Sequence, residues 1–77
     1  MNEYEIGGIC VKMTDDQAAA WNEGDMRPEL YEGARAYLTR PTNSYDEYDL
    51  SEILRMNSYP EGLEALEGNS ANLIRIR

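Results

Sequence analysis

Apolar and polar residues alternate at both ends of the chain. Residues 4–6 and 9–13 flank Gly7-Gly8, and both show the period of two that is typical of half-buried strands. Because glycine tolerates positive φ, the pattern predicts a tight hairpin, with a single strand that carries a glycine bulge as the alternative. Residues 73–77 alternate in the same way and predict a strand that pairs antiparallel with the N-terminal one.

This pairing of the two terminal strands would bring opposite charges together. Glu3 and Glu5 on the first strand would stand across from Arg75 and Arg77 on the last. Such exposed cross-strand pairs contribute well under about 1 kcal/mol each, so we expect them to set the register more than the stability.

A period near 3.6 residues in the middle of the chain predicts four short helices. The first spans residues 14–21 and begins at a capping box of Thr14 and Gln17, and Trp21 near its end is expected in the core or as a half-buried anchor. The second spans 28–38 and is ended by Arg40-Pro41, with a turn at Thr42-Asn43. The others span 44–57 and 58–68, and Gly68 is placed for a C-cap.

The third of these helices has the strongest signal. Ser44 and Glu47 match a capping box, and acids fill the first turns, where the helix dipole favours negative charge. Leu50, Ile53 and Leu54 then follow at i, i+3 and i+4, which is the spacing of one apolar stripe.

Together these elements predict one α+β domain spanning residues 1–77. We expect a small sheet of the N-terminal hairpin or strand and the C-terminal strand, packed against about four short helices. A chain of this size buries roughly 60% of its unfolded surface, so the core is small. The expected core residues are Ile9, Val11, Leu30, Ala34, Leu38, Leu50, Ile53, Leu54, Leu63, Leu66, Ile74 and Ile76.

The charge balance limits the possible partners. The chain has 15 acids, 7 bases and no histidine, for a formal net charge of -8. Direct binding to nucleic acid or to an anionic membrane needs a basic patch and is therefore disfavoured. An acidic field suits basic partners instead, of which proteins that bind nucleic acid are the commonest.

The location and the chemistry follow from a few absences in the sequence. No apolar run is long enough to span a bilayer, and the single Cys10 fits a reducing compartment, so we expect a cytoplasmic protein. Without histidine, neither a usual general base nor an activator for Cys10 is present. No zinc or calcium ligand pattern occurs. We therefore expect no enzyme, no cofactor and no metal, and keep a small enzyme or metal binder only as a third class.

Six tyrosines and no phenylalanine point to protein contacts, because tyrosine combines apolar area with a polar tip and is enriched at interfaces. Acids and tyrosines are densest in residues 45–52. The alternative is that these are ordinary half-buried tyrosines beside a solvated acidic helix start. The predicted partner-binding residues are Tyr45, Asp46, Glu47, Tyr48, Asp49 and Glu52, extended by Glu29 and Glu32.

In its small size, acidity, single cysteine and lack of histidine, the chain resembles phage-encoded inhibitors of host defence, including anti-CRISPR and anti-restriction proteins, some of which mimic DNA. The likeness rests on this profile and assigns no role to any residue. It implies an inhibitor that occupies the nucleic-acid-binding surface of a basic host complex. The alternative is an acidic adaptor or regulatory subunit that binds a protein partner through an apolar, tyrosine-rich face.

Overall fold

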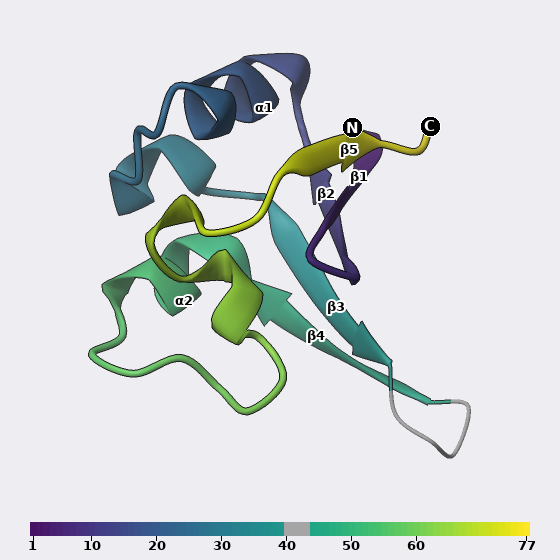
Figure 1. Cartoon of the computed structure of the whole chain (residues 1–77), viewed down its shortest axis with the longest axis vertical. Helices are drawn as coiled ribbons and strands as arrows, with labels where there is room; N and C mark the ends of the chain where they lie inside the picture. Colours follow the sequence, from purple (N-terminus) through teal and green to yellow (C-terminus); the bar gives the residue numbers. More distant parts are fainter. Residues whose placement is uncertain (40–43) are drawn as a thin grey trace.

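Five antiparallel strands form one sheet, in the order β4-β3-β2-β1-β5 (Figure 1). The computed structural model describes residues 1–39 and 44–77. Its strands are β1 (Asn2–Ile6), β2 (Ile9–Met13), β3 (Arg35–Thr39), β4 (Tyr45–Asp49) and β5 (Leu73–Arg75).

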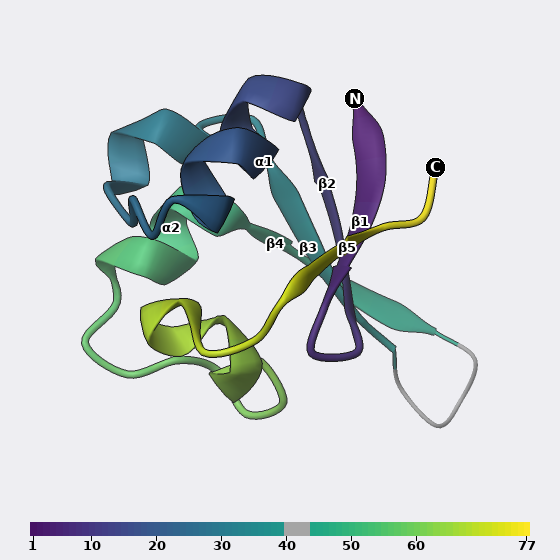
Figure 2. The same ribbon diagram turned by 45° about the horizontal axis from the view of Figure 1, so that its top comes forward.

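Short helical segments cover one face of this sheet (Figures 1 and 2). They are the α-helices α1 (Asp15–Asn22) and α2 (Leu50–Arg55) and the 3-10 segments η1 (Pro28–Tyr31) and η2 (Glu64–Asn69). The α+β class is thereby confirmed. The expectation of about four helices was slightly off, because the helices predicted over 28–38 and 58–68 are reduced to 3-10 turns, and strands β3 and β4 take over parts of 28–38 and 44–57.

The two N-terminal strands form a hairpin rather than a bulged strand. Gly7 and Gly8 have φ of 58° and 85°, as a tight hairpin turn requires, and Ile6 pairs with Ile9 across it. Gly7 is also closely packed: a Cβ built there would lie 2.4 Å from the Cβ of Ala65.

The C-terminal strand pairs antiparallel with β1, as predicted, but in a different register. Arg75 lies opposite Tyr4 and its guanidinium is 3.9 Å from Asp15, while Glu3 pairs with Lys12. Alternate residues therefore point outward, and Ile74 and Ile76 are 56% and 49% exposed. Their prediction as core residues was wrong, because a period of two shows which residues share a face but not which face is buried.

The predicted helix over 28–38 is also wrong. Only the 3-10 turn η1 forms; Gly33 then adopts a φ of 84°, and the chain continues as strand β3. In residues 35–38 the side chains alternate between the two faces of the sheet, with Arg35 and Tyr37 outward. This alternation competes with the helical spacing of the same residues, and pairing with β2 and β4 favours the strand. The expected helix end at Arg40-Pro41 and the turn at Thr42-Asn43 lie outside the described residues.

The helix over 44–57 forms only in its second half. Residues 45–49 pair with β3, and α2 begins at Leu50. Asp49 caps it, because its Oδ1 accepts hydrogen bonds from the Ser51 amide at 3.0 Å and the Ser51 hydroxyl at 2.7 Å. The predicted cap at Ser44 is five residues too early. The helix over 58–68 shrinks to η2, and the helical conformation breaks within it at Glu67 and at Gly68, which has a φ of 60°.

The first helix forms as predicted. The Thr14 hydroxyl accepts from the Gln17 amide at 3.1 Å, and Gln17 Oε1 accepts from the Thr14 amide at 2.9 Å, which completes the capping box. The Gln17 side-chain amide also donates to the carbonyls of Leu30 and Glu32, so it ties α1 to the segment around η1.

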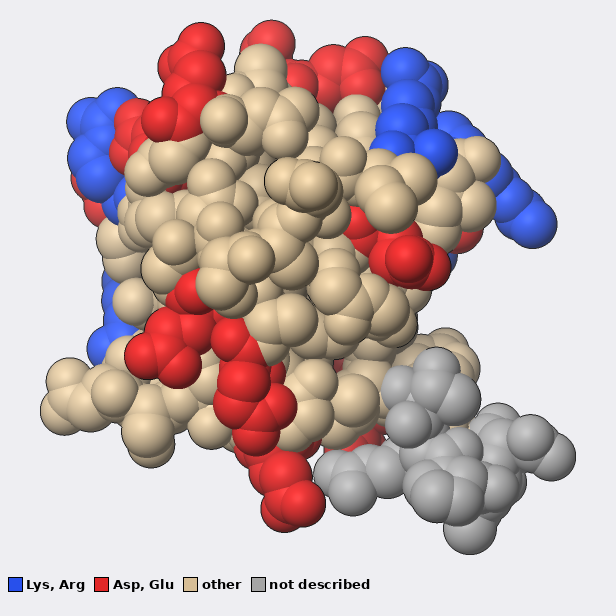
Figure 3. Space-filling view, in the orientation of Figure 1, with Lys and Arg blue, Asp and Glu red and all other residues tan. Residues whose placement is uncertain are grey.

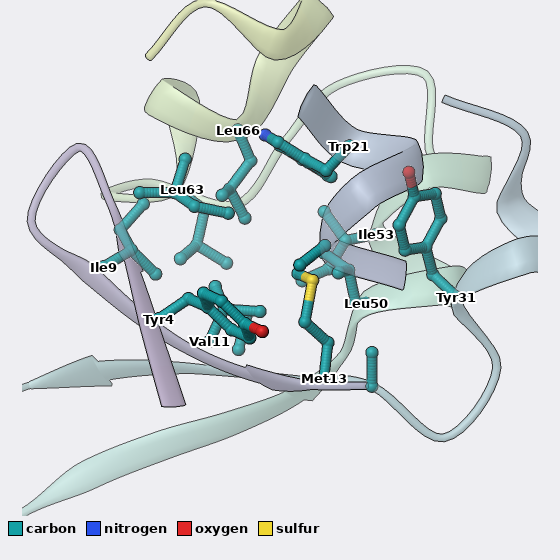
Figure 4. Packing of buried hydrophobic residues seen from close by; sticks show 14 residues of the cluster. Tyr4, Ile9, Val11, Met13, Trp21, Tyr31, Leu50, Ile53, Leu63 and Leu66 are labelled. Atoms are coloured by element: carbon teal, nitrogen blue, oxygen red, sulfur yellow. The ribbon is translucent and has the colours of Figure 1, made fainter. Parts of the chain in front are cut away.

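The core lies between the sheet and the helical segments (Figure 4). Trp21, predicted as a core or half-buried anchor, is fully buried, with its ring edge-to-face on Tyr31 at 5.6 Å. Leu30, Leu38 and Leu54 are only half-buried, against the edge of the core. Predicted core residues that are buried are Ile9, Val11, Ala34, Leu50, Ile53, Leu63 and Leu66; the prediction omitted Tyr4, Ile6, Met13, Ala18, Tyr31 and Ala36.

Candidate protein-binding surfaces

The alternation of β4 divides the predicted partner-binding residues between the two faces of the sheet. Tyr48 lies opposite the buried Ala36 and packs against the core, and Asp46 lies opposite Leu38 on the same side. Tyr45, Glu47 and Asp49 therefore point to the other face, which no helical segment of the described chain covers (Figure 2). The continuous acidic helix face predicted for residues 45–52 does not form.

The remaining predicted residues lie among the helical segments. Glu52 is exposed on α2, and Glu29 and Glu32 are exposed on and just after η1, which packs against α2. Glu32 forms a 3.8 Å ion pair with Arg55 of α2. These three carboxylates therefore lie on neighbouring elements of the fold.

We call the outward residues of the five strands the open sheet face. It has four carboxylates and two cations, a balance of -2, and both cations are paired within the face. Arg35 lies 3.4 Å from Glu47 and 3.2 Å from Asp49. The open sheet face consists of Glu3, Glu5, Cys10, Lys12, Arg35, Tyr37, Tyr45, Glu47, Asp49, Ile74 and Ile76.

Asp49 has a structural role that its sequence position did not suggest. Hydrogen bonds from Ser51, with a smaller contribution from Arg35, hold the pKa of its carboxyl below the usual value. Its side chain is 28% exposed, since it bridges the cap of α2 and the open sheet face. A carboxylate committed in this way contributes less to a partner than a free one.

Two aromatic side chains lie on the β3–β4 side of the open sheet face. The rings of Tyr37 and Tyr45 meet edge-to-face with centroids 5.5 Å apart, and the Lys12 ammonium lies 5.3 Å from the Tyr37 centroid. With Cys10 they line a shallow, open hollow. Tyr37 was not predicted on this surface because residues 28–38 were assigned to a helix. The alternation of Arg35 and Tyr37 with Ala36 was the signal that could have shown it.

Two side chains of this hollow, Cys10 and Tyr37, have raised pKa values. Burial, followed by the charge of Glu3, raises the pKa of the Cys10 thiol, so the thiol is protonated and weakly nucleophilic at neutral pH. Burial and the neighbouring Glu47 likewise raise the pKa of Tyr37. In residues 1–39 and 44–77, no three Cys, Asp or Glu side chains converge as metal ligands. Within the same residues, no helix is long and apolar enough to cross a membrane.

The net charge is distributed very unevenly between the two layers. We call residues 14–34 and 50–72, which include all helical segments, the helical layer; they contain ten acids and two bases, a balance of -8. The remaining residues, which include all strands, contain five acids and five bases. In Figure 3 acidic side chains (red) are spread over this view, and basic ones (blue) lie towards its margins. The helical layer therefore carries the entire net charge of the molecule.

Comparison of the chain with known protein families, curated proteins and solved structures gives no match.

Proposed function

We propose that this protein is an inhibitor that binds a basic host complex and occupies the surface on which that complex binds nucleic acid. The class that fits is a phage-type anti-defence protein, with anti-CRISPR and anti-restriction proteins as the nearest examples. The observation that carries the proposal is the concentration of the whole net charge of -8 on the helical layer. Carboxylates on one side of a small fold can replace phosphates as partners of lysines and arginines.

The helical layer supplies the contact residues. Of the residues predicted from the sequence, Glu29, Glu32 and Glu52 belong to it, and all three are exposed. Their elements are packed together, so approaching cations meet several carboxylates at once. Of the predicted residues on β4, Asp46 and Tyr48 lie on the side of the helical layer and remain in the proposal as the edge of this contact. Tyr45, Glu47 and Asp49 point to the open sheet face and leave it.

The site of action proposed is the cytoplasm. Cys10 is a free thiol, which fits a compartment that keeps thiols reduced. The proposed partner is a basic protein or nucleoprotein complex. The excess of acid on the helical layer argues against direct nucleic-acid binding, because it would repel phosphates.

The alternative function, an acidic adaptor, would use the aromatic hollow of Tyr37 and Tyr45 on the open sheet face. Ionic strength separates the two functions. Charge-steered binding through the helical layer weakens steeply as salt rises, whereas binding through an aromatic hollow does not.

The proposal is tested by affinity capture from host extract in the presence and absence of excess duplex DNA. The expected result is that the protein captures a nucleic-acid-binding complex, that DNA displaces it, and that the variant Glu29→Lys/Glu52→Lys no longer captures it. Glu5→Lys, on the open sheet face, is the control and should capture normally. Capture that resists both DNA and the double reversal would contradict the proposal.

A further inference from the structure

We infer that the outer edge of β4 is a docking site for an extended, basic segment of another protein, which adds to the sheet as a further strand. Among residues 1–39 and 44–77, β3 is the only strand that pairs with β4, so β4 ends the sheet on one side (Figure 1). The strand at the opposite end, β5, has three residues, whereas β4 has five. The inference does not depend on the proposed function, because it uses the edge of the sheet and not the helical layer.

The backbone of β4 directs hydrogen-bonding groups away from the sheet. In an antiparallel ladder only alternate residues of a strand bond to a given neighbour. The Leu50 amide donates to the Ala34 carbonyl at 3.0 Å, so the residues of β4 an even number of positions before Leu50 bond to β3. The backbone groups of the intervening residues point outward; these residues are Tyr45, Glu47 and Asp49.

These outward groups are available to an added strand. Tyr45 and Glu47 each offer an amide and a carbonyl, and no other described residue hydrogen-bonds to them through its backbone. Asp49 offers its amide alone, because the carbonyl of an N-cap residue accepts the first bond of its helix. A row of such donors and acceptors is the template to which an extended peptide adds in β-augmentation.

The side chains of β4 exclude a second copy of this chain as the occupant. Two copies that pair through β4 about a two-fold axis run antiparallel, with their outward-bonding residues opposite one another. The registers that pair three or more residues of β4 are centred on Asp46, Glu47 or Tyr48. The first opposes Asp46 to itself, the second opposes Glu47 to itself, and the third opposes Glu47 to Asp49. Every register therefore sets like charges against one another, which is destabilising.

Charge selects a basic segment instead. β4 contains three acids and no base. Arg35 of β3 lies 3.4 Å from Glu47 and 3.2 Å from Asp49, so these three side chains together keep one negative charge. Arg35 and the Tyr37 hydroxyl both contact Oε1 of Glu47, which leaves Oε2 for a cation of the partner. Since the Glu47 side chain is 50% exposed, a lysine or arginine directly opposite it on the added strand forms a cross-strand ion pair.

Tyr45 adds apolar area two residues before Glu47, on the same face of β4. Its side chain is 63% exposed, and its ring contacts Tyr37 edge-to-face at 5.5 Å. A lysine or arginine opposite Tyr45 packs its aliphatic stem on this ring and holds its cation beside it. The segment that fits the edge therefore has cations at alternate positions, opposite Tyr45 and Glu47.

An NMR titration of the isotope-labelled full chain tests this inference. The probe is a synthetic peptide of alternating lysine and valine, about six residues long, with blocked ends, added up to about 1 mM. We expect saturable binding that slows hydrogen exchange of the amides of Tyr45, Glu47 and Asp49, while the amide of Tyr48, which already bonds to β3, changes little. A peptide that does not bind, or that leaves the exchange of these three amides unchanged, would overturn the inference.

Two methylated forms of the peptide, with the same charge, distinguish strand addition from attraction by charge. Methylation of the lysine amides removes the donors that face β4 when lysines lie opposite Tyr45 and Glu47, whereas the valine amides point away from it. We expect the first form to bind at least about tenfold more weakly than the unmodified peptide and the second to lose less than about threefold. Equal binding of the two forms would mean that charge alone attracts the peptide, and would overturn the inference.

A matched pair of protein variants locates the site on β4. Glu47→Lys and Glu61→Lys change the net charge equally, but Glu61 is an exposed residue before η2. We expect Glu47→Lys to weaken binding of the unmodified peptide at least about tenfold, because attraction across the strands becomes repulsion, and Glu61→Lys to weaken it less than about threefold. Circular dichroism checks that both variants are folded. An equal effect of both variants would overturn the placement on β4.

Discussion

Single residues with special backbone or hydrogen-bonding roles hold the two layers of the molecule together. Gly7 is one, because it combines a φ of 58° with a close approach to Ala65 of η2. Its neighbour Gly8 has a φ of 85° but open space where a Cβ would be. Substitutions at the two glycines therefore distinguish the cost of backbone strain, which both share, from the cost of a clash with Ala65, which only Gly7 has.

We expect Gly8→Ala to lower the free energy of unfolding by about 1 kcal/mol, through backbone strain alone. Gly7→Ala should cost at least about 2 kcal/mol more, since the new methyl group must displace Ala65 of η2 from the hairpin. Urea unfolding monitored by Trp21 fluorescence measures both. Equal losses for the two variants would mean that η2 does not pack on the hairpin turn.

Asp49 is a second such residue, and its role makes a prediction about pH. Its pKa is lowered in the folded state, chiefly by the hydrogen bonds from Ser51. The stability that it contributes is therefore present above its unfolded pKa, about 3.9, and is lost as pH falls through the lower folded value. Asp49→Ala should cost about 1 kcal/mol at pH 7, the usual value of an N-cap, and much less at pH 2.

Paired urea melts of the wild type and Asp49→Ala at pH 7 and pH 2 give this comparison, and Asp16→Ala is the control. Asp16 lies in the first turn of α1, whose cap is Thr14, so its removal should change the stability little at either pH. A cost for Asp49→Ala that does not depend on pH would argue against the carboxylate as the cap.

Elements were predictable from the sequence where the local signals agree with the tertiary pairing. The hairpin at Gly7-Gly8 and α1 with its capping box follow from short-range patterns, and the pairing of β5 with β1 follows from the alternation that both ends of the chain share. The stretch 44–55 contains an apolar helix stripe and two possible caps, Ser44 and Asp49. Pairing of β4 with β3 selects Asp49, and this pairing was not expected because residues 35–38 had been assigned to a helix.

The prediction of the candidate site was also partly wrong, because a helix was expected where β4 forms. Glu29, Glu32 and Glu52 were correctly expected at exposed positions, because charge alone predicts exposure. The faces of Tyr45, Asp46, Glu47 and Tyr48 were not predictable, since a strand sends neighbours to opposite sides where a helix groups them by turns. The open sheet face also went unseen because β3 was assigned to a helix.

The second α-helix gives a prediction at this scale. Ile53 is fully buried, whereas Leu54, its neighbour in the same predicted stripe, is only half-buried. We expect Ile53→Ala to lower the free energy of unfolding by about 2–5 kcal/mol, and Leu54→Ala by about 1–2 kcal/mol, because less apolar area and a smaller cavity are involved. Urea melts decide it: a larger loss for Leu54→Ala would mean that α2 is rotated relative to the core.

The whole molecule has two sides of different electrostatic character. The helical layer carries a net charge of -8, and the strands with their connections are balanced. The two surfaces should therefore respond differently to salt. Binding of a basic partner to the helical layer should weaken as ionic strength rises, whereas binding through the aromatic hollow of the open sheet face should change little.

The most direct test of the account is the rate at which the protein associates with its captured partner, measured against ionic strength. Wild type, Glu29→Lys/Glu52→Lys and the control Glu5→Lys are compared by stopped flow. We expect the wild-type rate to fall at least about tenfold between low and high salt, the double reversal to be slow and nearly independent of salt, and the control to follow the wild type. A wild-type rate that does not change with salt, or a double reversal that associates like the wild type, would contradict the claim that the helical layer binds the partner.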